Sequence, residues 1–69
     1  MSNSLYKIIE LVGTSPTSWE DAATSAVESA AKTLKEVRVA EVEDLDLKIE
    51  NGKVTTYRAR VKLSFKYLS

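Results

Sequence analysis

The C-terminal part of the chain, from Val54 to Tyr67, alternates apolar and polar side chains almost without interruption. Successive side chains of a β-strand point to opposite faces, so this period predicts a strand with one buried and one exposed face. The apolar parity holds Tyr57, Ala59, Val61, Leu63, Phe65 and Tyr67. The other parity holds Thr56, Arg58, Arg60, Lys62, Ser64 and Lys66. The segment therefore predicts a half-buried strand whose outer face is basic.

A hairpin turn precedes this strand. Asn51-Gly52 is the strongest turn signal in the sequence, because both residue types tolerate positive φ. β-branched residues return from Val37 onward, but the apolar positions change parity between Val42 and Leu45. A slip of one residue turns every following side chain to the other face of a sheet. We therefore expect a β-bulge near Glu43–Asp44 in the strand that pairs with the C-terminal one.

The register of this hairpin can be predicted if the apolar side chains of both strands lie on the same face of the sheet. A three-residue loop, 50–52, places Leu47 opposite Thr55 and Leu45 opposite Tyr57, all facing inward. On the outer face the acidic residues Glu41, Glu43 and Asp44 then meet the basic residues Arg58, Arg60 and Lys62. We expect such exposed cross-strand pairs to set the register more than they stabilise the fold.

The N-terminal segment Leu5–Val12, LYKIIELV, is short and rich in β-branched and aromatic residues, which favours a strand. Both of its parities carry apolar side chains, so both of its faces need cover. A small antiparallel sheet ordinarily leaves one face toward water, and a partner subunit is the simplest cover for that face. Gly13–Pro16 interrupts the pattern and is expected to end this strand.

Helix-start signals follow this interruption. Thr17 and Glu20 form a T-x-x-E capping box, which is overlapped by an S-x-x-D pair at Ser18 and Asp21. A competing register uses Ser15-Pro16 as the cap and the first helical residue. Each of these registers starts a helix at nearly the same place.

The expected helix runs from about Ser18 to about Lys35. Its apolar stripe is Trp19, Ala23, Ala26, Val27, Ala30, Leu34 and Val37. Trp19 begins this stripe, so we interpret it as an anchor of the helix start against the sheet or a neighbouring subunit rather than as a ligand platform. We interpret the hydroxyl residues before it as turn and cap residues rather than nucleophiles; they are Thr14, Ser15, Thr17 and Ser18.

The order strand, helix, strand, strand predicts a single α+β domain over residues 1–69. The right-handed crossover rule makes the first two strands parallel to each other. The third strand runs antiparallel to both and fits between them, which gives a three-stranded antiparallel sheet of order 1-3-2 curved around one helix. A chain of this size buries only about 60% of the surface of its unfolded form, so we expect self-association to complete its core.

Composition excludes several functions. The sequence contains neither Cys nor His, which excludes disulfides, Cys/His zinc sites and His-dependent nucleophile pairs. Ten basic and ten acidic residues give no net charge, which argues against nucleic-acid binding. The apolar runs are too short to span a membrane, and the N-terminus shows no signal-peptide pattern. We therefore expect a cytoplasmic protein that is not an enzyme and binds neither nucleic acid nor membrane.

Three segments of the sequence resemble the dodecin family: YKIIELVGTSPTSWEDAA near the N-terminus, VAEVEDL after the helix and GKVTTYRARVKLSFK near the C-terminus. The resemblance covers about residues 5–66. It implies a β-α-β-β fold, assembly into a hollow homododecamer and storage of a small molecule without catalysis. In the best-known members that molecule is a flavin (FMN or riboflavin), bound as stacked pairs on two-fold axes.

Two positions match the family's flavin site but carry other residues. Val39 stands where those members have the tryptophan that stacks on the flavin, and Arg58 stands where they have a glutamine that hydrogen-bonds the ring. Because valine offers no flat aromatic face, we expect flavin binding to be weak or lost.

The segments GTSPTSWE and RVAEV are more similar to a branch of the family without that tryptophan, the calcium dodecins. This resemblance implies a bound divalent cation. The candidate ligands are Glu41, Glu43, Asp44 and Asp46, whose carboxylates are the oxygen donors that Ca²⁺ prefers. Ion pairing with the basic strand is the alternative role for these carboxylates, and a ligand-free structural shell is the alternative for the assembly.

Overall fold

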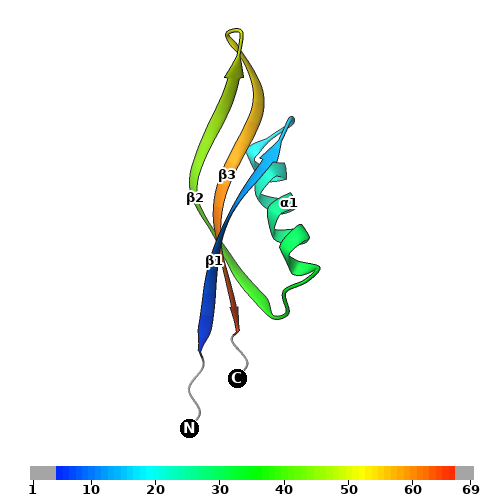
Figure 1. Cartoon of the computed structure of the whole chain (residues 1–69), viewed down its shortest axis with the longest axis vertical. Helices are drawn as coiled ribbons and strands as arrows, with labels where there is room; N and C mark the ends of the chain where they lie inside the picture. Colours follow the sequence, from blue (N-terminus) through cyan, green and yellow to red (C-terminus); the bar gives the residue numbers. More distant parts are fainter. Residues whose placement is uncertain (1–4, 67–69) are drawn as a thin grey trace.

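The structure is a computed structural model that describes residues 5–66. Its elements are β1 (Tyr6–Ser15), α1 (Trp19–Ala31), β2 (Val37–Glu50) and β3 (Lys53–Lys66). The strands form one sheet of order β1-β3-β2, and both outer strands run antiparallel to β3 (Figure 1). This confirms the predicted fold. Tyr67, which the alternation placed in the last strand, lies outside the described residues.

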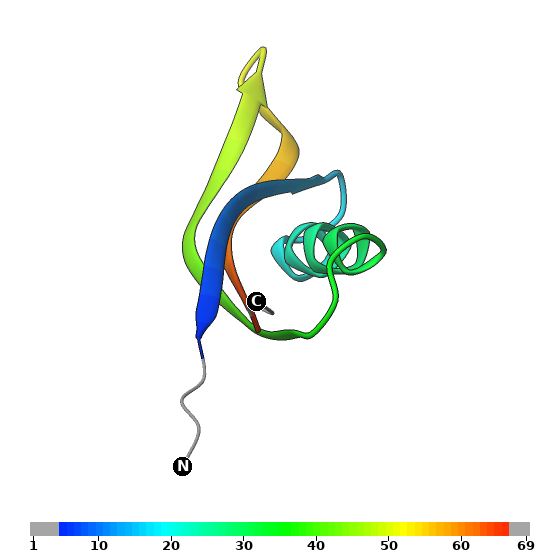
Figure 2. The ribbon, with the colours of Figure 1, turned by 60° about the horizontal axis from the view of Figure 1, so that its bottom comes forward.

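The sheet curves around α1, which lies in its concave side (Figure 2). The three central apolar residues of β3, Ala59, Val61 and Leu63, are completely buried there. Ala22 of α1 is buried as well. The parity predicted for the last strand is therefore confirmed, and β3 supplies most of the core because it is the middle strand beneath the helix.

Gly13 is where helix and sheet approach most closely. The prediction that the strand ends before Gly13 is wrong, since β1 continues to Ser15. A Cβ atom on Gly13 would lie 2.1 Å from the carbonyl oxygen of Ala22 and 2.9 Å from the Cβ of Ala26. Only a residue without a side chain lets α1 lie this close. This contact also buries Ala22, which the predicted apolar stripe omitted.

The cap of α1 is Ser18. Its hydroxyl accepts a hydrogen bond from the Asp21 backbone N–H at 3.0 Å. The capping-box register with Thr17 and Glu20 and the Ser15-Pro16 register are therefore wrong, and the overlapping Ser18/Asp21 pair is correct. The buried Ser15 hydroxyl instead donates to the Asp21 carboxylate at 2.7 Å, so these hydroxyls act as turn and cap groups, as predicted.

The helix ends earlier than expected. It stops at Ala31 rather than near Lys35, because the next backbone N–H groups bond three residues back instead of four, from Lys32 to Ser29 and from Thr33 to Ala30. Glu36 then adopts a left-handed conformation, with φ of 61°, and turns the chain into β2. The sequence did not predict this helix end, because no glycine or proline lies between Ala31 and Glu36.

The β2–β3 register confirms one prediction and corrects another. The pairing shifts by one residue between Val42 and Asp44, so Glu43 is the predicted bulge. The three-residue loop is wrong, because Glu50 pairs with Lys53 across a two-residue Asn51-Gly52 turn with φ values of 52° and 74°.

A second irregularity compensates for the shorter turn. Lys48 pairs with Thr56 and Ile49 with Val54, which leaves Thr55 without an opposite residue. As a result Leu47 lies opposite Tyr57 rather than Thr55, and Leu45 lies opposite Ala59 rather than Tyr57. Both shifts are by two residues, so each side chain keeps its predicted face.

Candidate functional site

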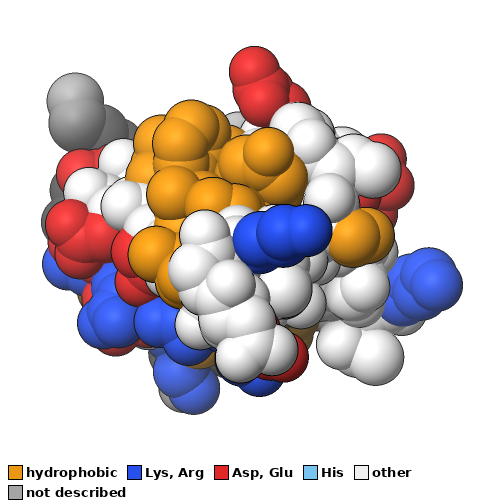
Figure 3. Space-filling view, turned by 90° about the horizontal axis from the view of Figure 1, so that it is seen from above, with side chains coloured by type: hydrophobic (Ala, Val, Ile, Leu, Met, Phe, Trp, Pro, Cys, Tyr) orange, Lys and Arg blue, Asp and Glu red, His pale blue; other side chains and the backbone are white. Residues whose placement is uncertain are grey.

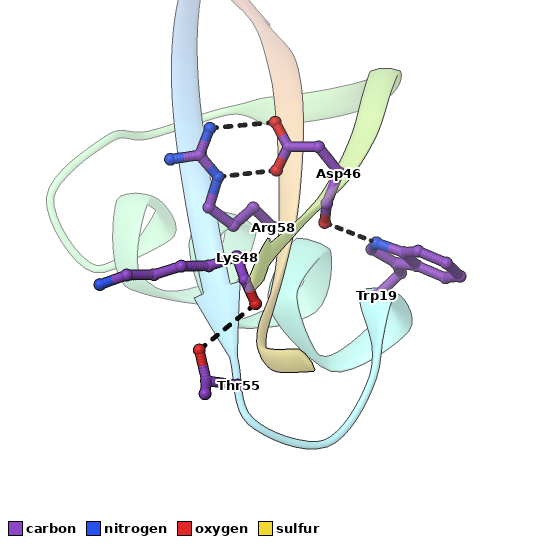
Figure 4. Close-up of polar contacts among 5 residues, drawn as sticks. All are labelled: Trp19, Asp46, Lys48, Thr55 and Arg58. Atoms are coloured by element: carbon purple, nitrogen blue, oxygen red, sulfur yellow. Dashed lines mark hydrogen bonds and ion pairs between the residues drawn. The ribbon is translucent and has the colours of Figure 1, made fainter. Parts of the chain in front are cut away.

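The outer face of the sheet, away from α1, carries a charged ladder. Arg58 of β3 donates two hydrogen bonds to Asp46 of β2, from Nε to Oδ1 at 2.7 Å and from Nη2 to Oδ2 at 2.9 Å (Figure 4). These bonds hold the pKa of the Asp46 carboxyl below its ordinary value, and the same contact raises the pKa of Arg58. The Arg58 guanidinium is therefore already engaged within its own chain.

A second cross-strand pair follows along the ladder. Lys62 lies 3.0 Å from the Glu43 carboxylate. Its hydrogen bond lowers the pKa of Glu43, with a smaller contribution from Glu10, and Glu43 in turn raises the pKa of Lys62. Within residues 5–66, the ion pair of Arg60 is a long one, 4.0 Å to Glu10 of β1. The predicted ion pairing between acidic residues of β2 and basic residues of β3 is thus confirmed for Glu43. Arg58, which was expected to meet one of the acids Glu41 to Asp44, pairs with Asp46 instead.

Two of the predicted metal-binding carboxylates keep their oxygens free. Glu41 and Asp44 are exposed and form no ion pair with any side chain of residues 5–66. Within this part of the chain no three acidic side chains gather closely enough to hold a metal ion. Calcium takes six to eight oxygen ligands, so one copy of the chain does not supply a complete site from these residues.

The two positions predicted to match the family's flavin site lie on this outer face but far apart. Val39 pairs with Ser64 of β3 and is 60% exposed, whereas Arg58 pairs with Asp46. Ser64 lies six positions after Arg58 along β3, which corresponds to about 20 Å of strand. A single copy therefore does not bring both side chains to one small ring system.

Trp19 fixes the start of α1 to the sheet. Its indole Nε1 donates to the Asp46 carbonyl oxygen at 3.1 Å (Figure 4). Its ring meets that of Tyr57 edge to face, with centroids 5.4 Å apart and planes at 82°. The anchoring role predicted for Trp19 is confirmed. Its link to Asp46 was not foreseen, because a backbone acceptor leaves no signal in the sequence.

Apolar grooves flank the helix on the concave side of the sheet. The groove between α1 and β2 has a volume of about 420 Å³ and is lined by Trp19, Glu20, Ala23, Thr24, Val42 and Leu45. Between α1 and β1 lies a groove of about 570 Å³, whose walls include Ile9, Leu11, Ser25 and Ser29. Large apolar side chains stay exposed on both faces, as the two apolar parities of the first strand predict.

Comparison with known proteins identifies the family. The sequence profile described as Dodecin matches residues 5–68. The chain belongs to the dodecin family. Among curated dodecins, the calcium dodecin of Mycobacterium tuberculosis is 44% identical over 63 residues, covering 91% of this chain and 89% of that protein.

Solved dodecin structures have the same fold. The dodecin of Streptomyces coelicolor superposes with a TM-score of 0.93 at 36% identity, over 100% of this chain and 99% of that one. The crystal structure of the Mycobacterium tuberculosis calcium dodecin, described as calcium chelating with a novel calcium-binding site, matches with a TM-score of 0.84 at 45% identity, over 94% and 93% of the two chains. Both the predicted family and the predicted dodecin fold are confirmed. No helix within residues 5–66 is long and apolar enough to cross a membrane.

Proposed function

We propose that this chain assembles into a hollow homododecamer that binds divalent cations, calcium first among them, and catalyses no reaction. The observation that carries the proposal is the 44% identity to a calcium dodecin over 91% of the chain. The carboxylates of Glu41 and Asp44 on the outer face of β2 support it, because they are hard oxygen donors without an ion-pair partner among residues 5–66.

Assembly is supported by how little of the chain is buried. Within residues 5–66 the buried apolar side chains are those of Ala22, Ala59, Val61 and Leu63, two of which are alanines. Larger apolar side chains are about half exposed or more, namely Ile8, Val12, Val42 and Leu45. A soluble monomer rarely leaves so much apolar surface open. Further copies of the chain would cover it, and symmetry axes would bring the carboxylates of several copies together.

A flavin, FMN or riboflavin, is the less supported ligand. Val39 has no aromatic face for stacking, and the Arg58 guanidinium is engaged by Asp46. We therefore expect weak or no flavin binding. A shell without any ligand is the remaining alternative.

Calcium-dependent melting tests the cation proposal. Wild-type protein is melted in CaCl₂ and in excess EGTA, beside the double variant Glu41→Gln/Asp44→Asn. Glu28→Gln is the matched control, because Glu28 is an exposed acid on α1. We expect calcium to raise the melting temperature of the wild type and of the control but not of the double variant, since a ligand that binds only the folded state stabilises it.

A melting temperature that is indifferent to both calcium and EGTA removes calcium from the proposal. In that case, loss of riboflavin fluorescence on adding micromolar protein supports flavin as the ligand. Unchanged riboflavin fluorescence supports a shell without a ligand. Native mass spectrometry tests the assembly separately, with an expected mass of twelve copies of the 7.7 kDa chain. A monomer under the same conditions contradicts it.

A further inference from the structure

The turn that joins β2 to β3 stands at the far end of the molecule, where the hairpin projects past β1 and α1 (Figure 1). The last residue pair between β1 and β3 is Ser15 with Tyr57, so the ribbon beyond Tyr57 consists of two strands only. Seen from above, no other part of residues 5–66 lies over this end (Figure 3). A two-stranded ribbon without cover is at best marginally stable in water, so its end opens locally at little cost in free energy.

Asn51 and Gly52 form this turn. Both have positive φ, 52° and 74°, because Glu50 pairs with Lys53 across only two residues. Such tight turns strongly prefer Asn-Gly, since asparagine tolerates this conformation and glycine adopts it freely. The same dipeptide is chemically labile, because the backbone nitrogen after an asparagine attacks the side-chain amide most readily when the next residue has no side chain. The residues that close the hairpin are therefore also a reactive pair.

Both reacting groups are free within residues 5–66. The Asn51 side-chain amide takes part in no hydrogen bond there, and the Gly52 N–H donates none. Both residues are exposed. Apart from the adjoining residues, no atom of this part of the chain lies within 4 Å of a Cβ placed on Gly52. No contact in this part of the chain therefore shields the attacking nitrogen or fixes the amide away from it.

We infer that Asn51 is a site of spontaneous covalent modification, converted into aspartate and isoaspartate through a cyclic imide with Gly52. The Gly52 backbone nitrogen loses its proton and bonds to the Asn51 Cγ. The bond from Cγ to the side-chain nitrogen breaks, and that nitrogen takes up the proton and leaves as ammonia. One water molecule then opens the ring.

The ring opens in two ways, and the products differ in their backbone. Breaking the new bond between the Asn51 Cγ and the Gly52 nitrogen gives aspartate, which suits the turn because Asp-Gly is also favoured there. Breaking the bond between the Asn51 backbone carbonyl carbon and that nitrogen gives isoaspartate, whose chain runs through the side chain. Isoaspartate adds one carbon to a connection that pairs Glu50 with Lys53 across two residues. Both products add a negative charge, but only isoaspartate removes the tight turn.

Peptide mapping after incubation tests the site. Folded wild-type protein is kept warm at mildly alkaline pH and digested with trypsin, which cleaves after Lys48 and Lys53 and releases residues 49–53, IENGK. Asn3 is the other asparagine of the sequence; it falls in the peptide of residues 1–7 and is followed by serine, so it is the internal reference. We expect aspartate and isoaspartate to accumulate in residues 49–53, resolved by chromatography and mass spectrometry, and much more slowly in residues 1–7. A sample digested before incubation corrects for conversion during digestion.

Gly52→Ala is the matched variant, because its Cβ lies beside the attacking nitrogen and meets no atom beyond the adjoining residues. We expect it to slow the conversion of Asn51 about tenfold or more. Circular dichroism confirms that the variant is folded. Asn51→Asp carries the new charge on an unchanged backbone. We expect aged wild-type protein that is rich in isoaspartate to melt at a lower temperature than Asn51→Asp, and equal melting temperatures contradict the loss of the turn.

Several outcomes overturn the inference. If residues 49–53 stay unchanged in the folded protein, the inference is wrong, and conversion only in protein unfolded in guanidinium chloride then shows that the fold protects Asn51. Equal rates in the wild type and in Gly52→Ala show that the Gly52 nitrogen is not the attacking group. Aspartate without isoaspartate shows direct hydrolysis of the amide instead of a cyclic imide. The proposed cation binding is tested on protein that has not been aged, so the failure of either proposal leaves the other standing.

Discussion

Replacing Gly13 by alanine tests the close approach of α1 to the sheet. The new Cβ would lie 2.1 Å from the Ala22 carbonyl oxygen and 3.0 Å from the Ala22 carbonyl carbon, whereas ordinary contacts begin near 3.4 Å. The nearest atom belongs to the helix backbone and the next is the Ala26 Cβ, which has no rotatable position, so no side-chain rotation relieves the overlap. The helix has to move away from β1 by about 1.3 Å, the difference between 2.1 and 3.4 Å.

The magnitude follows from this displacement. Overpacking of a well-packed core typically costs about 1–3 kcal/mol, and a gap of about 0.5–1 Å already forfeits a quarter to a half of each contact's attraction. Alanine recovers about 0.5–1 kcal/mol, because glycine loses more backbone entropy in a strand. We expect Gly13→Ala to lower the free energy of unfolding by about 2–2.5 kcal/mol, which is the upper end of the overpacking range less the recovered entropy. At this chain length that lowers the melting temperature by about 10–20 °C.

The measurement is urea unfolding followed by Trp19 fluorescence and circular dichroism, at one fixed protein concentration because association shifts apparent stability. Gly52→Ala is the matched control. Gly52 has a φ of 74° and nothing within 4 Å of a new Cβ, so its expected loss is only the conformational penalty of about 1–2 kcal/mol.

A second variant isolates the cause. Ala26→Gly added to Gly13→Ala removes the contact at 2.9 Å but leaves the one at 2.1 Å with the Ala22 carbonyl oxygen. We expect no rescue of stability. A Gly13→Ala protein as stable as the wild type, or full rescue by Ala26→Gly, refutes the argument that backbone contact fixes the helix here.

Three further changes probe other parts of the fold. Ser18→Ala is expected to lower the free energy of unfolding by about 1 kcal/mol through loss of the helix cap, with a much smaller loss for Thr17→Ala, both measured by urea titration. Leu63→Ala, at a completely buried position, is expected to lower it by about 2–5 kcal/mol; a loss below that of Ser18→Ala contradicts the core assignment. Because the pKa of Asp46 is lowered in the folded chain, the unfolded chain takes up this proton first as the pH falls. The stabilisation by the Asp46–Arg58 pair is complete above the unfolded pKa of about 4 and is lost as the pH falls through the folded value. Asp46→Asn is therefore expected to reduce the fall in the free energy of unfolding on the acid side, measured by urea titration at several pH values. An unchanged slope contradicts a stabilising role of the pair.

The outer-face charges show how far a sequence pattern predicts a site. The alternation of β3 put Arg58, Arg60 and Lys62 on one face, and that placement is correct. Which carboxylate each of them meets depended on the hairpin register. The register differs by two residues from the predicted one, because the Asn51-Gly52 turn is tight and Thr55 is left unpaired. Asp46 therefore became the partner of Arg58.

The acidic group on β2 could be identified as a set but not as a complete site. Their side-chain type marks Glu41 and Asp44 as oxygen donors, and the structure adds that they are the members without an ion pair in the described part of the chain, residues 5–66. A calcium site needs more ligands than these two. In the proposed assembly, other copies of the chain would supply the remaining ligands, and their positions would follow from the shape of the surface rather than from residue types.

The sequence by itself determined the order of the elements, the buried parity of β3 and the bulge at Glu43. Each of these depends on period and local turn chemistry, which act over a few neighbouring residues. Only the tertiary structure decided the role of Gly13, the buried position of Ala22 and the link from Trp19 to the Asp46 carbonyl. These contacts join residues distant in the sequence through backbone atoms, which every residue type carries alike, so no side-chain pattern distinguishes them.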